Sequence, residues 1–132
     1  DLLVQLAERL AAPVATTISG KGVFPESHPL WLWNGFGRMA PQFVQRVMED
    51  CDCLLAVGCR FSEVATGSYG LETPDSLIHI DADPEVFNHN RPAAVALAGD
   101  ARVVLAGGRR RQVREVWFHS ISSTGGRSPS MT

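Results

Sequence analysis

The sequence predicts an α/β domain built on a largely parallel sheet. Three observations favour this class: short apolar runs that stop at glycine, amphipathic segments with helical spacing, and the alternation of the two along the chain. The run at 53–57, followed by Gly58, is typical of a strand that is buried on both faces. Ligands of open parallel sheets bind beyond the carboxyl ends of such strands, so we look for a site in the turns that follow them.

The first part of the chain alternates helix, strand and irregular segments. Apolar residues at helical spacing predict a helix at 2–10, which Pro13 ends. Residues 13–18 are rich in β-branched side chains and predict a strand. A glycine-rich loop follows at 19–22, and prolines keep 24–29 irregular. The next residues, 30–36, are aromatic and apolar and contain an Asn-Gly turn signal.

The middle of the chain continues the same alternation. Proline in the first turn predicts a helix at 41–50, and the apolar run at 53–57 predicts a strand. Glycine and proline break any pattern in 62–75, so we expect a loop there. A third strand is predicted at 77–81, and an Asp-Pro pair predicts a short helix at 83–87.

The last predicted elements are a strand at 94–98 and a helix at 100–105 that Asp100 caps. After them the pattern stops, because 107–132 is first basic and then rich in serine and glycine. We therefore expect one domain over 1–106, followed by a disordered tail over 107–132.

Length, charge and hydropathy narrow the class of protein further. The chain has 132 residues, enough for one core and too few for two. Its net charge of −2 argues against a nucleic-acid partner, and no apolar run approaches the roughly 18 residues of a membrane span. The chain begins at Asp1 without an initiator methionine, so we expect a piece of a longer protein.

Three cysteines, Cys51, Cys53 and Cys59, lie close together in the sequence. An odd number without C-x-x-C spacing predicts neither a disulfide framework nor a zinc site. We expect buried or half-buried thiols in a protein of the reducing cytoplasm.

Candidate ligand groups follow the first two predicted strands. In the loop at 19–22, Lys21 can meet a phosphate, but the loop is neither a Walker loop nor G-x-G-x-x-G, so a tight turn is the favoured interpretation. In the turn that begins at Gly58, Arg60 can pair with a phosphate or carboxylate, and a surface role explains it equally well.

Later strands offer acidic candidates. Asp81 stands where dinucleotide folds place an acid on a ribose hydroxyl, and it can equally be part of a helix-capping turn. Asp100 has the same two interpretations, and we expect His79 to be a packed core histidine. No nucleophile has an interpretable base, so the residues alone indicate a binding or structural domain.

A series of motifs in one order, from about Leu6 to Leu105, resembles a known family. The motifs lie at 12–17, 20–26, 28–30, 51–52, 54–61, 66–67, 78–81, 83–84, 91–92 and 99–100. Together they resemble the middle domain of thiamine-diphosphate-dependent enzymes, most closely the acetolactate synthase group. The resemblance implies a Rossmann-like parallel sheet with flanking helices, the DHS-like NAD/FAD-binding fold. It also implies that the family's first strand, which precedes the opening helix, is missing here, which leaves an edge for self-association.

The resemblance implies a function for the longer enzyme rather than for this chain alone. The parent would be a 2-keto acid carboligase or decarboxylase such as acetolactate synthase, a transferase or lyase of the cytoplasm and a homo-oligomer. Its pyrimidine- and diphosphate-binding domains would hold thiamine diphosphate and magnesium and supply the catalytic glutamate. Residues 99–101 lack the second glycine of the family's magnesium motif. We therefore expect no catalytic residue in this chain and no activity from it alone, and no nucleic acid or membrane as partner.

In relatives the middle domain binds FAD, ADP or nothing. The positions that match its cofactor contacts are Thr17, Ile18, Gly35, Arg38, Gly58, Cys59, Arg60, Asp81, Ala82 and Asp100. Two departures matter: Val64 replaces the second arginine of the family's R-F-D-D-R-V-T-G, and residues 35–38 replace its G-M-H-G. We predict that this chain does not hold FAD.

The alternative is a free-standing Rossmann-like module that binds FAD, NAD or ADP. Such a module needs an intact glycine-rich first turn, and none is visible in the sequence. The middle domain of a thiamine-diphosphate enzyme is the favoured interpretation.

Overall fold

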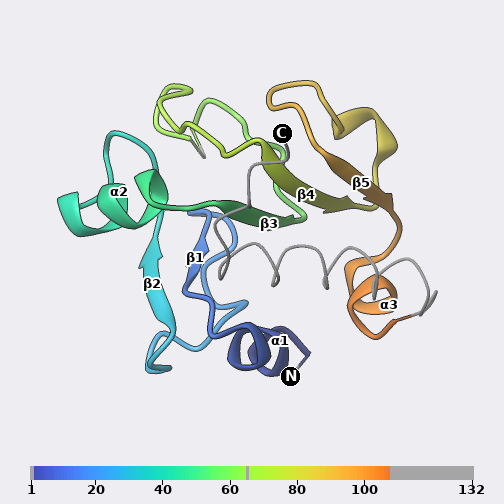
Figure 1. Ribbon diagram of the computed structural model, residues 1–132, viewed down its shortest axis with the longest axis horizontal. Helices are drawn as coiled ribbons and strands as arrows, with labels where there is room; N and C mark the ends of the chain where they lie inside the picture. Colours follow the sequence, from blue (N-terminus) through green and yellow to red (C-terminus); the bar gives the residue numbers. More distant parts are fainter. Residues whose placement is uncertain (1, 65, 108–132) are drawn as a thin grey trace, which may run out of the picture.

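The computed structural model describes residues 2–64 and 66–107, which form a mixed α/β domain (Figure 1). The elements are α1 (Leu2–Leu10), β1 (Val14–Thr16), β2 (Trp31–Asn34), α2 (Gln42–Glu49), β3 (Cys53–Val57), β4 (Ser76–Asp81), the short 3₁₀-helix η1 (Pro84–Val86), β5 (Val95–Ala98) and α3 (Ala101–Leu105). Every strand pair is parallel, which confirms the predicted fold class. The predicted disordered tail lies outside the described residues. Within those residues, no helix is long and apolar enough to cross a membrane.

The strands form two sheets rather than one. β1 pairs with β2, while β3, β4 and β5 form a second sheet in that order. Parallel pairing is regular from Cys53 opposite Ser76 to Val57 opposite Ile80. Among the described strands, none lies between β1 and β3, so the predicted sheet is interrupted there.

The structure changes three predicted elements. Residues 31–34 form β2, to which the sequence analysis assigned no strand. The strand predicted at 13–18 ends at Thr16, because the next residues turn back and the Gly20 amide donates to the Thr17 carbonyl at 3.0 Å. The helix predicted at 83–87 is the single 3₁₀ turn η1.

Strand β4 forms the centre of the core. Its residues from Leu77 to Ile80 are all buried, because β3 and β5 flank them and side chains cover both faces. Ala56, Cys59, Phe61 and Leu71 pack with Leu77 in one apolar cluster. Full burial of such side chains is the main favourable contribution to folding, at roughly 1.5–3 kcal/mol each.

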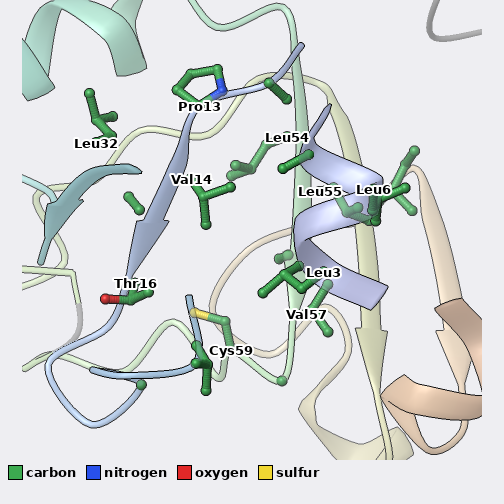
Figure 2. A pocket seen from close by; sticks show the side chains of 18 of the residues that line it. Leu3, Leu6, Pro13, Val14, Thr16, Leu32, Leu54, Leu55, Val57 and Cys59 are labelled. Atoms are coloured by element: carbon green, nitrogen blue, oxygen red, sulfur yellow. The ribbon is translucent and has the colours of Figure 1, made fainter. Parts of the chain in front are cut away.

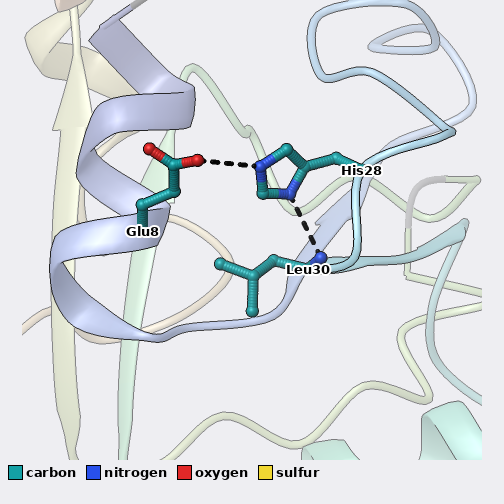
Figure 3. A network of polar contacts seen from close by, with 3 residues as sticks. All are labelled: Glu8, His28 and Leu30. Atoms are coloured by element: carbon teal, nitrogen blue, oxygen red, sulfur yellow. Dashed lines mark hydrogen bonds and ion pairs between the residues drawn. The ribbon is translucent and has the colours of Figure 1, made fainter.

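The loop before β2 is attached to α1 through His28 (Figure 3). The Leu30 amide donates to His28 Nδ1 at 3.1 Å, so the ring proton is on Nε2. That nitrogen lies 3.2 Å from Glu8 Oε1 on α1. Helix α1 also contacts α3, and both helices lie on the same side of the strands (Figure 1).

Candidate functional site

The carboxyl ends of the three strands of the larger sheet lie next to one another. The amide of Gly58, just after β3, donates to the Ile80 carbonyl at 2.8 Å. The amide of Gly99, just after β5, donates to the Asp81 carbonyl at 2.9 Å. The predicted site residues that follow these strands are therefore brought together along one edge, as expected for a parallel sheet. They are Gly58, Cys59, Arg60, Asp81, Ala82 and Asp100.

The acidic residues at this edge cap local turns. Asp81 Oδ1 accepts the Asp83 amide at 2.9 Å. Asp100 Oδ1 accepts the amides of Arg102 at 2.9 Å and Val103 at 3.2 Å, and so caps α3. The sequence left two interpretations for each acid, a cap of a local turn or a contact with a ribose. The structure shows both acids as caps, and contact with a ribose stays a prediction.

The loop after β1 is a tight turn. The Gly20 amide donates to Thr17 Oγ1 at 2.9 Å, so the Thr17 hydroxyl is already used within the turn. Lys21 Nζ lies 3.8 Å from Glu26 Oε1 in an exposed ion pair, and neighbouring Ile18 is 62% exposed. The favoured interpretation of this loop as a turn agrees with these contacts.

The loop after β2 packs against the loop after β3. A Cβ at Gly37 would lie 2.2 Å from the Thr66 carbonyl oxygen, so only glycine allows this approach. Thr66 is fully buried, and its hydroxyl donates to the Ser62 carbonyl at 2.8 Å and accepts the Tyr69 amide at 3.1 Å. The predicted residues Gly35 and Arg38 flank this contact, which the sequence analysis did not foresee.

Arg91, which the sequence analysis did not name as a site residue, holds the loop after β3 in place. The guanidinium of Arg91 donates to the carbonyls of Leu71 at 3.0 Å, Tyr69 at 2.9 Å and Asn90 at 2.9 Å. The Asn90 side chain in turn donates to the Arg60 carbonyl at 3.0 Å. No sequence signal pointed to this role, because the Leu71 and Tyr69 carbonyls lie 20 and 22 residues before Arg91.

Two other arginines present unengaged charges at the same end of the sheets. The side chains of Arg38 and Arg60 are exposed. Within the described residues, neither guanidinium has a hydrogen bond or ion pair. Both remain available to an anionic ligand.

The thiol and the imidazole near this edge do not form a catalytic pair. Burial raises the pKa of the Cys59 thiol, and the nearby charge of Asp81 adds to that effect, while a backbone hydrogen bond at Phe61 opposes it. The thiol therefore stays protonated at neutral pH and is a poor nucleophile. His79 is 1% exposed and donates from Nε2 to the Cys59 carbonyl at 2.8 Å, which confirms it as a core histidine. In the described residues, no cluster of His, Cys, Asp and Glu can hold a metal ion.

A cavity of about 1080 Å³ lies between β1 and β3 (Figure 2) and extends to their carboxyl ends, where the predicted site residues Thr17, Gly58 and Cys59 contribute to its lining. Most of its lining is apolar, and α1, β1, β3 and α3 all contribute to it. Examples are Leu3, Leu6, Val14, Leu55, Val57 and Cys59.

Residues 1–107 match the family model described as "Thiamine pyrophosphate enzyme, central domain". The chain belongs to this family. Its relatives include the probable acetolactate synthase large subunit of Methanocaldococcus jannaschii, 42% identical over 104 residues, which cover 78% of this chain and 17% of that protein. The acetolactate synthase large subunit of Parasynechococcus marenigrum is 37% identical over 107 residues, which cover 80% of this chain and 17% of that protein. The probable 2-ketoarginine decarboxylase AruI of Pseudomonas aeruginosa is 37% identical over 105 residues, which cover 80% of this chain and 18% of that protein.

These matches confirm the resemblance, and with it the central domain of thiamine pyrophosphate enzymes as the kind of domain this is. The chain spans about a sixth of the length of the curated relatives that it matches. Membership of the family implies thiamine diphosphate as the cofactor of enzymes that carry such a domain. It does not favour the free-standing nucleotide-binding module.

Proposed function

We propose that this central domain serves a thiamine-diphosphate-dependent 2-keto acid carboligase or decarboxylase of the acetolactate synthase type. The observation that carries the proposal is the match of residues 1–107 to the family together with 42% identity to an acetolactate synthase large subunit. The decarboxylase among the relatives keeps the second reaction type within the proposal.

Its role in that enzyme is structural. Thiamine diphosphate supplies the carbanion chemistry, and the pyrimidine- and diphosphate-binding domains of the parent are its binding partners here. Among the described residues of this chain, no cluster of His, Cys, Asp and Glu could bind the magnesium ion of the cofactor. The Cys59 thiol is protonated and so is a poor nucleophile. We assign the domain to residues 1–106, with 107–132 as a separate tail, and expect no activity from the chain alone.

A chimera tests the proposed function directly. We expect residues 2–105 to replace the aligned segment of the Methanocaldococcus jannaschii protein and to retain at least about a tenth of its acetolactate formation from pyruvate. Activity survives because a structural domain needs only compatible packing, and no reacting group is exchanged. The isolated chain, supplied with pyruvate, thiamine diphosphate and Mg²⁺, should form no acetolactate above background.

The same exchange in the Pseudomonas decarboxylase provides the matched control. It asks whether the domain supports carboligation, decarboxylation or both. A chimera that folds with the parent's oligomeric mass yet loses more than about a thousandfold in both scaffolds would contradict a structural role, because a loss of that size is typical of removing a group that acts in the transition state.

We further propose that the carboxyl edge does not retain FAD. Val64 is 75% exposed and brings no charge to the position where flavin-binding relatives have arginine, and the Asp81 and Asp100 carboxylates are engaged in caps. The guanidiniums of Arg38 and Arg60 suit a diphosphate, a group that ADP and FAD share, and ADP needs no contact for a flavin ring, so ADP is the nucleotide that we propose for this edge.

We expect FAD or NAD at up to about 100 μM to shift the melting temperature of the chain by less than about 1 °C. A ligand that bound the native state tightly would stabilise it by about 2.7 kcal/mol at a hundredfold excess over its Kd. A saturating rise of several degrees with FAD would contradict the proposal. A rise with ADP that the Arg60→Ala variant loses would assign the nucleotide to this edge.

The longer enzyme is proposed to be a cytoplasmic homo-oligomer. All three cysteines are unpaired, as is usual for thiols in a reducing compartment. Trp33, Phe43 and Met39 are 37%, 51% and 86% exposed, and the Trp33 and Phe43 rings lie 5.9 Å apart edge to face. This apolar surface is suited to burial in a subunit contact. The mass of the active chimera in solution will show whether the enzyme is an oligomer.

A further inference from the structure

Residues 67–69 form a short stretch of left-handed backbone. Gly67, Ser68 and Tyr69 have φ angles of +59°, +57° and +59°. Residues other than glycine rarely adopt this conformation, and when they do they adopt it singly rather than in succession. Two consecutive non-glycine residues are therefore strained here, and such strain persists only where the surrounding structure imposes it. We call residues 66–71, which contain this turn, the strap.

Residues that precede the turn hold the first part of the strap. The Ser68 amide donates to the Glu63 carbonyl at 2.8 Å, and the Tyr69 amide donates to Thr66 Oγ1 at 3.1 Å. Thr66 is fully buried, and its own amide donates to the Ser62 carbonyl at 3.0 Å. The amino end of the strap is therefore fixed to the core.

The side chain of Arg91 holds the other end of the strap. Its Nε donates to the Leu71 carbonyl at 3.0 Å, and its Nη2 donates to the Tyr69 carbonyl at 2.9 Å. Nη2 also donates to the Leu71 carbonyl, and Nη1 donates to the Asn90 carbonyl at 2.9 Å. One guanidinium thus binds the carbonyl of the last left-handed residue and the carbonyl of the last residue of the strap.

The charge of Arg91 has no acidic partner in the part of the chain that the structure describes. All its hydrogen bonds there go to neutral carbonyls, and the ion pairs of the domain involve other residues. The side chain is only partly buried, so a solute can reach it. A guanidinium binds phosphate or carboxylate through two parallel N–H bonds, which adds both energy and geometric specificity. An oxyanion is therefore a better partner for this group than a carbonyl.

An oxyanion cannot bind in this way without releasing a carbonyl of the strap. A guanidinium has two edges that offer paired N–H groups, one formed by Nε and Nη2 and the other by Nη1 and Nη2. Both edges include Nη2, and both N–H groups of the Arg91 Nη2 are engaged by the Tyr69 and Leu71 carbonyls. Exchange of partners would remove the bonds that offset the strain at Ser68 and Tyr69. A bound oxyanion therefore favours an open strap.

We propose that Arg91 is a binding site for a phosphate group, and that phosphate bound there opens the strap. A phosphate carries more charge than a carboxylate, so it competes better with the carbonyls. Opening would expose Thr66 and Leu71, which are buried in the closed strap. The inference is independent of the ADP contact proposed above, which involves Arg38 and Arg60.

Amide exchange with solvent in the full chain tests the proposal, with inorganic phosphate as the probe. At constant ionic strength, about 50 mM phosphate should speed exchange of the Ser68 and Tyr69 amides at least about fivefold, because these amides lose their partners when the strap opens. The Leu77 and Ile80 amides of β4 should not change. Acetate at the same concentration should give less than about half of the effect. If the chain alone is unfolded, the same amides are followed in the Methanocaldococcus jannaschii chimera.

Two substitutions separate this site from a general effect of salt. Arg91→Lys keeps the charge but loses the planar fork, so the strap amides should exchange at least about tenfold faster without phosphate, and phosphate should add nothing. Ser68→Gly relieves one strained residue and leaves Arg91 in place. About fivefold more phosphate should then be needed for the same exchange rate, because the closed strap is less strained.

Three results would overturn the proposal. One is unchanged or slower exchange of the strap amides with phosphate, since the anion would then not compete with the carbonyls. Another is an equal phosphate response in Arg91→Lys, which would attribute the effect to the salt. The third is a response that Arg60→Ala abolishes, because phosphate would then act at the edge proposed for ADP and not at Arg91.

Discussion

Replacing His79 by alanine will lower the free energy of unfolding by about 3–4 kcal/mol, measured by urea denaturation. The imidazole is 1% exposed, and its ring centroid lies 5.3 Å from that of Phe61 and 5.1 Å from that of Phe87, edge to face in both pairs. Alanine removes these contacts and leaves the buried Cys59 carbonyl without the donor that now lies 2.8 Å away. Cavity formation and an unpaired polar group each cost free energy.

Three comparison variants separate the two causes. His79→Gln can place an amide donor near the position of Nε2, so it should retain part of the hydrogen bond and cost about 1 kcal/mol less than alanine. His79→Phe fills the space and removes both the Nε2 donor and the buried Nδ1, which has no hydrogen-bond partner among the described residues, so it reports on the sum of the two effects. Exposed His89→Ala should change stability by less than about 0.5 kcal/mol. Equal losses for alanine, glutamine and phenylalanine at position 79 would contradict the assigned hydrogen bond.

The sequence predicted the elements whose cause is local. The apolar run at 53–57 and the glycine after it indicated β3, and Asp100 indicated the start of α3, which its carboxylate caps in the structure. His79 was correctly predicted as a core residue because it stands within a strand of apolar neighbours. Each of these features depends on residues within one turn or one strand, which is why composition and spacing revealed them.

The features that escaped prediction depend on contacts between distant residues. β2 has only four residues and follows a proline-rich loop, so its strand character depends on pairing with β1. The hydrogen bond from His79 to Cys59 joins residues twenty positions apart, as do those from Arg91 to Leu71. The interruption between β1 and β3 is a matter of strand order, and only the resemblance to the family, not a local pattern, led us to expect a missing strand. The candidate edge was predictable from strand direction, whereas the packing of its loops was not.

Gly37→Ala will destabilise the domain by at least about 3 kcal/mol, more than the backbone conformation alone explains. Gly37 has φ +81°, and a Cβ there would lie 2.2 Å from the Thr66 carbonyl oxygen and 2.9 Å from its carbon. Thr66 cannot easily retreat, because it is fully buried and its hydroxyl is bound to both Ser62 and Tyr69. The substitution should therefore separate the loops after β2 and β3.

Gly22→Ala is the matched control for this prediction. Gly22 has φ +92°, and a Cβ there would have no neighbour within 4 Å, so its cost is only that of left-handed backbone, about 1–2 kcal/mol. The difference between the two variants in urea denaturation therefore measures the clash with Thr66. Faster amide exchange at Thr66 and Tyr69 in Gly37→Ala, and not in Gly22→Ala, would place the damage at the paired loops. Equal destabilisation by the two substitutions would show that these loops are not held together by close packing at Gly37, and that the carboxyl edge is more open than its contacts indicate.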